Sequence, residues 1–178
     1  EFSPAFGWST SWILEALNAN GSGHCYSYDL VSHSKKYLPA AGVDTSRWTL
    51  KAGDVQKQYA NFNLEHGLDL LFIDCLHTSG FAERYIEEVL KPAQNVCKRA
   101  GKEILVFIHD VFPATDAHNT ELNTVREFLK EKNYEYFTPS PRERWHKELL
   151  ELRSQIGIGK EGRIHSSQTN PSVIFKLQ

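Results

Sequence analysis

Several short apolar or aromatic runs of this sequence end in polar residues that could bind a ligand or move a proton. These polar endings are Glu1 with Ser3, Asp29, Asp54, Asp74 with His77, and His109 with Asp110. A single acidic residue after a strand is commonplace, because Asp favours turns and helix N-caps. Five such endings in succession are hard to attribute to turn chemistry alone, so we expect a site built from several strand ends.

The last two endings have the residue types needed to remove a proton from a hydroxyl group. His77 and His109 are candidates for a general base, because the unperturbed pKa of histidine is close to neutrality. The carboxylates of Asp74 and Asp110 are hard oxygen ligands, and a divalent cation held there could lower the pKa of a hydroxyl instead. The residues alone leave both routes open.

Strand and helix patterns alternate along the chain and would position these residues. Strand patterns span His24–Leu30, Trp48–Val55, Leu68–Asp74, Glu103–Phe112, Tyr134–Phe137 and Ser172–Leu177. Helical patterns span Ser9–Ala19, Phe81–Lys102, Thr120–Lys132 and Arg142–Gln155. We expect Ser9 or Thr10 to cap the first helix and Pro92 to bend or interrupt the second. This alternation predicts an α/β fold with a largely parallel sheet, in which ligands bind at the carboxyl ends of the strands.

Composition excludes several classes of protein. The 178 residues carry 20 Lys and Arg against 22 Asp and Glu, a net charge of −2, so the basic excess of a nucleic-acid-binding protein is missing. Apolar runs fall well short of the roughly 20 residues that span a membrane. Cys25, Cys75 and Cys97 show no metal-binding spacing, and three free thiols suit a reducing, cytoplasmic compartment.

The sequence resembles the class I S-adenosylmethionine-dependent methyltransferases, especially the small-molecule O-methyltransferases called methyltransferase family 24. The motifs that carry the resemblance are G-W-S-T from Gly7, G-D-V from Gly53, L-L-F-I-D-C-L-H from Leu70 and V-F-I-H-D-V from Val106. The resemblance implies a Rossmann-like sheet that is mostly parallel, with an antiparallel last strand and helices on both faces. It covers nearly the whole chain as one methyltransferase domain, residues 1–178.

The resemblance also implies which residues bind the cofactor, S-adenosylmethionine. Glu1, Ser3, Gly7 and Ser9 match the turn that holds the methionine part, with Glu1 at its cationic end. This turn often has two or three glycines in the family, whereas the chain has Ser3, Ala5 and only Gly7. Asp29 matches the acid that accepts both ribose hydroxyls, and Asp54 matches the acid that receives the adenine amino group.

The implied catalytic residues are Asp74, His77 and His109. Metal-dependent relatives hold their cation with a carboxylate after the fourth strand and a polar pair after the fifth. Asp74, His109 and Asp110 stand there, so they are the metal candidates for Mg or Mn, with His109 as a substitution. His118 and His165 lie in loops and are weaker candidates for the substrate side.

The resulting hypothesis is an O-methyltransferase that acts on a hydroxyl of a small acceptor, with a sugar or glycan preferred by analogy with the family. Alternatives are metal-dependent methylation of phenolic or other small metabolites, a nicotinamide-dinucleotide enzyme, and a non-catalytic cofactor-binding module. The missing G-x-G-x-x-G counts against the dinucleotide. We expect no nucleic-acid or membrane partner. Because only Glu1 and Phe2 of a first strand are present, we also expect an excerpt of a longer chain with further domains possible upstream.

Overall fold

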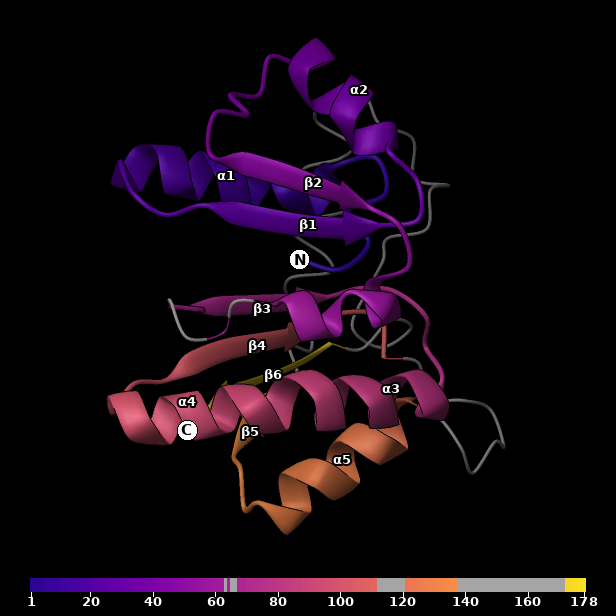
Figure 1. Cartoon of the computed structure of the whole chain (residues 1–178), viewed down its shortest axis with the longest axis vertical. Coiled ribbons are helices and arrows are strands. Elements are labelled where there is room, and N and C mark those ends of the chain that lie inside the picture. Colours follow the sequence, from indigo (N-terminus) through magenta and orange to yellow (C-terminus); the bar gives the residue numbers. More distant parts are fainter. Residues whose placement is uncertain (63, 65–66, 112–120, 138–171) are drawn as a thin grey trace, which may run out of the picture.

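Strands and helices alternate along the chain in the computed structural model (Figure 1), which describes residues 1–62, 64, 67–111, 121–137 and 172–178. Strand β1 (Cys25–Asp29) pairs in parallel with β2 (Trp48–Ala52), and β3 (Leu70–Ile73) pairs in parallel with β4 (Ile104–Ile108). Strand β6 (Val173–Leu177) runs antiparallel between β4 and β5 (Tyr136–Phe137). The expected parallel sheet with an antiparallel last strand is therefore confirmed.

Phe2 joins the two parts of this sheet. It forms one parallel bridge with Tyr28 of β1 and another with Ile73 of β3, and the N-terminus lies between these strands in Figure 1. The side chain of Phe2 is buried and stacks on Tyr59. The residues that follow Phe2 consequently leave the sheet beside the ends of β1 and β3.

Helices cover both faces. Figure 1 shows α1 (Trp8–Asn20) behind β1 and β2, with α3 (Ser79–Tyr85) and α4 (Lys91–Ala100) in front of β4 and β6. The remaining helices are α2 (His33–Ala40) and α5 (Glu121–Glu131), and two short 3-10 turns span Val55–Lys57 and Tyr59–Asn61. Two buried apolar clusters result, a small one around Leu14, Cys25 and Leu38 and a large one that includes the inward residues of β3, β4 and β6.

The predicted helix Phe81–Lys102 is one helical segment with an irregular centre. A π-helical turn, Ile86–Leu90, separates α3 from α4, and the main-chain N–H of Lys91 donates to the carbonyl of Ile86. Pro92 follows this turn within the helical segment, where it has no N–H to donate and its ring crowds the preceding turn. The expected interruption is confirmed, and the wider turn is how the chain accommodates it.

One expectation about the first half of the chain was wrong, and one helix was not predicted. Helix α1 begins at Trp8 behind a left-handed Gly7, and no side chain caps it, so neither Ser9 nor Thr10 is its N-cap. Helix α2 was not predicted, because its sequence, HSKKYLPA, is polar and contains a proline. The predicted stretch Arg142–Gln155 lies outside the described residues, as do His118 and His165.

No helix in the described part of the chain combines the length and apolar character needed to cross a bilayer.

Candidate active site

The loop between Phe2 and α1 has an unusual backbone. Ser3 (φ 61°), Ala5 (φ 48°) and Gly7 (φ 96°) are all left-handed, a conformation that L-residues adopt at a cost of about 1–2 kcal/mol. Glycine adopts this conformation without the steric cost that a side chain brings. The loop therefore keeps a glycine-type backbone although two of its three left-handed residues have side chains.

The carboxylate of Glu1 holds this loop against the sheet. It accepts hydrogen bonds from the hydroxyls of Ser9 (2.6 Å), Thr10 (2.7 Å) and Ser27 (2.5 Å). Trp48 extends the network, because its indole N–H donates to Ser27 Oγ at 2.8 Å. Glu1 and Ser9 thus stabilise the loop through hydrogen bonds within the protein. Their contact with a cofactor stays a prediction.

Asp29 and Asp54 stand at the ends of β1 and β2 and organise the chain in the same way. Asp29 Oδ1 accepts from the main-chain N–H of Val31 (3.1 Å), and Asp54 Oδ1 accepts from that of Gln56 (3.0 Å). In each of these turns, the Asp side chain accepts a hydrogen bond from the main-chain N–H two residues later. Asp29 Oδ2 also accepts from the N–H of Ala5 at 2.9 Å. A carboxylate has about four acceptor positions, so both residues retain capacity for a ligand.

These residues line a cavity of about 410 Å³ at the carboxyl ends of the parallel strands, where ligands bind in such sheets. Its walls include Ser3, Asp29, Asp54 and His77 of the predicted site. Glu1, Gly7 and Ser9 are not among the lining residues. The prediction missed the apolar part of the wall, formed by Tyr28, Leu30, Val55, Cys75, Leu76 and Phe81.

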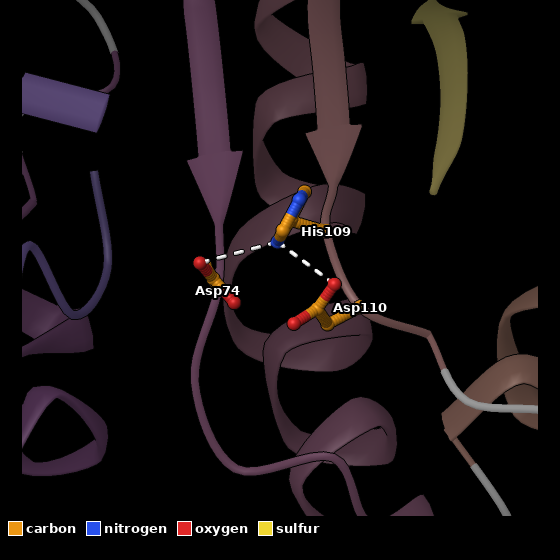
Figure 2. Close-up of side chains that lie close together, drawn as sticks. All are labelled: Asp74, His109 and Asp110. Carbon is orange, nitrogen blue, oxygen red and sulfur yellow. Dashed lines mark ion pairs between the residues drawn. The ribbon is translucent and has the colours of Figure 1, made fainter. Parts of the chain in front are cut away.

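A second group of polar side chains lies beside this cavity, after β3 and β4 (Figure 2). Asp74 follows β3, and His109 and Asp110 follow β4, as the ribbon in Figure 2 shows. His109 Nδ1 is 3.3 Å from Asp74 Oδ2 and 3.2 Å from Asp110 Oδ1. His77 reaches the same group, with Nε2 3.9 Å from Asp74 Oδ1. The structure thus brings all four predicted residues together.

This group has the composition of a cation site. Within the described ranges, Asp74, His109 and Asp110 form the group whose candidate ligand atoms lie within 4.8 Å of one another. His109 Nδ1 and Asp110 Oδ1 are buried atoms for which the described residues supply no well-formed hydrogen bond. Asp110 has φ 52°, a left-handed conformation that aspartate tolerates better than most residues. An imidazole nitrogen and two carboxylates that converge in this way fit a divalent cation.

The charges of the site favour protonated imidazoles in the absence of a cation. The neighbouring Asp74 carboxylate raises the pKa of His109 above 6.5, although partial burial opposes this. Burial alone would lower the pKa of His77, but its contact with Glu121 outweighs that effect and raises it. Burial raises the pKa of the Cys75 thiol to about 12, so Cys75 lines the cavity as a neutral thiol.

Sequence reasoning missed Glu121. Its buried carboxylate lies 2.8 Å from His77 Nδ1. A signal was present, because Glu121 shares one helix face with Val125 and Phe128 at the spacing i, i+4, i+7. An acidic residue on an inward face is unusual enough to mark a site.

The fold and this arrangement define an α/β domain with a cavity at the carboxyl ends of its parallel strands, beside a group of titratable residues. Residues 5–111, more than half of the chain, match the family described as a methyltransferase domain. The chain belongs to this family, and it is a class I S-adenosylmethionine-dependent methyltransferase.

Solved structures agree with this fold. A protein from Klebsiella pneumoniae whose crystal structure is described as that of a putative O-methyltransferase is 17% identical to this chain. The match covers 98% of this chain and 70% of the other, with a TM-score of 0.57. The O-methyltransferase TomG from Streptomyces achromogenes, which acts in tomaymycin synthesis and was solved with S-adenosylmethionine, is 12% identical over 99% of this chain and 70% of its own, with a TM-score of 0.61. No curated protein matched the sequence.

Proposed function

We propose that this methyltransferase transfers the methyl group of S-adenosylmethionine to a hydroxyl of a small acceptor, and that the acceptor is a sugar. One observation carries the proposal. His77 lines the same cavity as Asp29 and Asp54, and its Nε2 lies 3.9 Å from Asp74, which belongs to the group formed with His109 and Asp110. A cofactor cavity beside groups that can take a proton is what O-methylation requires.

The cavity residues fit the cofactor. Carboxylates after β1 and β2 are suited to the ribose hydroxyls and the adenine amino group, because a carboxylate accepts several hydrogen bonds. The apolar walls supplied by Leu30, Leu76 and Phe81 suit the faces of a purine ring. When bound, S-adenosylmethionine supplies an electrophilic methyl group on a positively charged sulfur.

The residues after β3 and β4 would prepare the acceptor. His77 or His109 can take the hydroxyl proton, since His77 lines the cavity and His109 lies 3.3 Å from Asp74, the neighbour in sequence of the lining residue Cys75. Asp74, His109 and Asp110 would hold Mg or Mn, and the convergence of their candidate ligand atoms within 4.8 Å supports this assignment. A cation there would orient the acceptor oxygen and lower the pKa of its hydroxyl.

A sugar acceptor suits the polar character of this group. Carboxylate and imidazole acceptors can receive hydrogen bonds from several hydroxyls of one sugar ring. A phenolic acceptor offers fewer such hydroxyls and relies more on apolar contact, so phenols are the second class that we would test. The O-methyltransferases that resemble this chain in structure are compatible with either. The three free cysteines also support a reducing, cytoplasmic setting.

Calorimetry and a transfer screen test the proposal. We expect S-adenosylhomocysteine to bind and NAD to give no heat; the reverse result would overturn the choice of cofactor. Transfer of labelled methyl from S-adenosylmethionine would then be followed over sugars, phenols and carboxylates, with and without EDTA. Turnover on sugars that EDTA abolishes and Mn restores is the expected result. Turnover on phenols alone would replace the acceptor class, and indifference to EDTA would remove the cation.

A further inference from the structure

A buried carboxylate links the cavity wall to the interior of the protein. Glu121, the first residue of α5, is 1% exposed. One of its oxygens, Oε2, lies 2.8 Å from His77 Nδ1, and the other, Oε1, accepts a hydrogen bond from the hydroxyl of Tyr85 at 3.0 Å. Tyr85 is fully buried in α3. Three separate elements therefore meet at this one side chain.

Stability alone gives a poor account of this arrangement. Burying a carboxylate carries a large desolvation cost, and well-packed apolar residues at such positions are often as stable or more stable. Burial does raise the pKa of Glu121, although His77 and Tyr85 both oppose that effect. An apolar side chain at position 121 would complete the inward face that Val125 and Phe128 begin. The carboxylate is thus better explained by what it does to His77.

We propose that Glu121 is a positioning residue that holds the proton of His77 on Nδ1, so that Nε2 is the atom that receives the proton of the acceptor hydroxyl. The proposal rests on the function proposed above. A neutral imidazole carries one N–H, and a close acceptor at one ring nitrogen favours the proton there. Glu121 Oε2 lies 2.8 Å from Nδ1, within hydrogen-bond distance, whereas Asp74 Oδ1 lies 3.9 Å from Nε2. Because Glu121 can only accept when ionised, it selects the Nδ1–H form, which leaves Nε2 as the basic nitrogen.

The transfer then balances in atoms and charge. The hydroxyl oxygen forms a bond with the methyl carbon, its proton passes to His77 Nε2, and the electron pair of the broken carbon–sulfur bond stays on sulfur. The positive charge that leaves sulfur reappears on the imidazole ring. The Glu121 carboxylate, 2.8 Å from Nδ1, stabilises that charge as it forms.

The variant E121Q tests the positioning role. Glutamine has nearly the same shape and can still accept from Tyr85, but its NH₂ group can donate to His77 Nδ1 and so permit the other ring form. The matched control is Y85F, which removes the second hydrogen bond of the same carboxylate and leaves its charge. Both variants would first be compared with wild type in thermal unfolding and in binding of S-adenosylhomocysteine.

Nitrogen-15 NMR of the His77 ring, at a pH where the ring is neutral, reads the tautomer directly and needs no acceptor. We expect the proton on Nδ1 in wild type and in Y85F, and an Nε2–H population in E121Q. With the acceptor found in the transfer screen, we expect E121Q to lower kcat about 100-fold, the scale of general-base catalysis, with KM for S-adenosylmethionine unchanged. Y85F should change kcat little.

Two results would overturn the proposal. One is an Nε2–H tautomer in the wild-type protein. The other is an equal loss of kcat in E121Q and Y85F that follows their loss of stability, which would make Glu121 a purely structural link between α3 and α5. Failure of the wild-type protein to bind S-adenosylhomocysteine would instead contradict the proposed function. The NMR measurement reports the His77 tautomer in either case, so it distinguishes that outcome from a failure of the proposal on Glu121.

Discussion

Asp29 Oδ2 accepts a hydrogen bond from the main-chain N–H of Ala5 at 2.9 Å, which ties the end of β1 to the loop that precedes α1. The same carboxylate closes its own turn through Val31 and lines the cavity. One side chain therefore both shapes the loop and lines the proposed cofactor cavity. A change at Asp29 should affect both.

We predict that Asp29→Ala lowers affinity for S-adenosylhomocysteine by about 10-fold or more, since hydrogen bonds to a charged group contribute about 1.5–3 kcal/mol each. Calorimetry measures the affinity. Asp44→Ala is the matched control, because Asp44 closes the same kind of turn through the N–H of Ser46 at 2.9 Å and is not among the residues that line the cavity. Equal affinity in the two variants would contradict a ligand role for Asp29.

The left-handed loop gives a second prediction, on stability. Ala5→Gly should leave the free energy of unfolding unchanged or raise it by up to about 1 kcal/mol, because the relief of left-handed strain offsets the greater entropy of the unfolded chain. Ala16→Gly, at an exposed position within α1, should lower it by about 1 kcal/mol. Urea unfolding measures both, and a similar loss in the two variants would show that position 5 is unstrained.

A side chain at Gly7, in contrast, should destabilise the protein. A Cβ atom at Gly7 would lie 2.7 Å from Leu38 Cγ, and the backbone there has φ 96°. We predict that Gly7→Ala lowers the free energy of unfolding by roughly 2–4 kcal/mol, the sum of overpacking and left-handed strain. The same urea experiment measures this loss. A loss of less than about 1 kcal/mol, smaller than either cause alone, would mean that α2 moves aside.

Much of the fold could be predicted from sequence because its strands are apolar and separated by turns. The run around Leu70–Ile73 and the run around Ile104–Ile108 are buried on at least one face and contrast with their flanks. Helix α2 could not be found in this way, since its polar sequence buries only Ser34 and Leu38. Its place depends on packing against α1 and β1, which periodicity does not report.

The residues of the candidate site also differ in whether the sequence could predict them. Asp29, Asp54, Asp74 and His109 were predictable because the carboxyl ends of parallel strands meet at one edge. The contact between Glu121 and His77 was not predictable, since 44 residues separate them and only folding brings α5 beside the loop after β3. Ser9 or Thr10 was expected to cap α1, but the helix begins before both of them, at Trp8, and their hydroxyls donate to the Glu1 carboxylate.

The group after β3 and β4 gives a prediction on metal binding. We expect Mn to bind the cofactor-free protein, and Asp110→Asn to weaken binding about 10-fold or more, because affinity depends on the number of charged ligands. Asparagine tolerates the left-handed backbone of Asp110, so the fold should survive. Asp69→Asn, at an exposed carboxylate that pairs with Lys102, is the control. Mn titration followed by electron paramagnetic resonance measures both, and unchanged affinity in Asp110→Asn would exclude Asp110 as a ligand.

The raised pKa of His109 predicts how stability depends on pH when EDTA keeps the group free of cations. Its folded pKa lies above the 6.5 of an unperturbed histidine, chiefly through Asp74, so the folded chain binds more protons than the unfolded chain between these two values. The stabilising contribution is therefore complete below about pH 6.5 and is lost as pH rises through the folded pKa.

Asp74→Asn should reduce this pH-dependent loss of the free energy of unfolding by about 0.2–1 kcal/mol, the range for partly exposed ion pairs. The comparison needs urea unfolding of wild type and variant at intervals from pH 5.5 to 8.5, all in EDTA. Asp69→Asn again serves as the control, because its carboxylate is paired with Lys102 rather than with a histidine. If the wild-type and Asp74→Asn curves stay parallel across this range, the carboxylate of Asp74 does not stabilise a protonated His109.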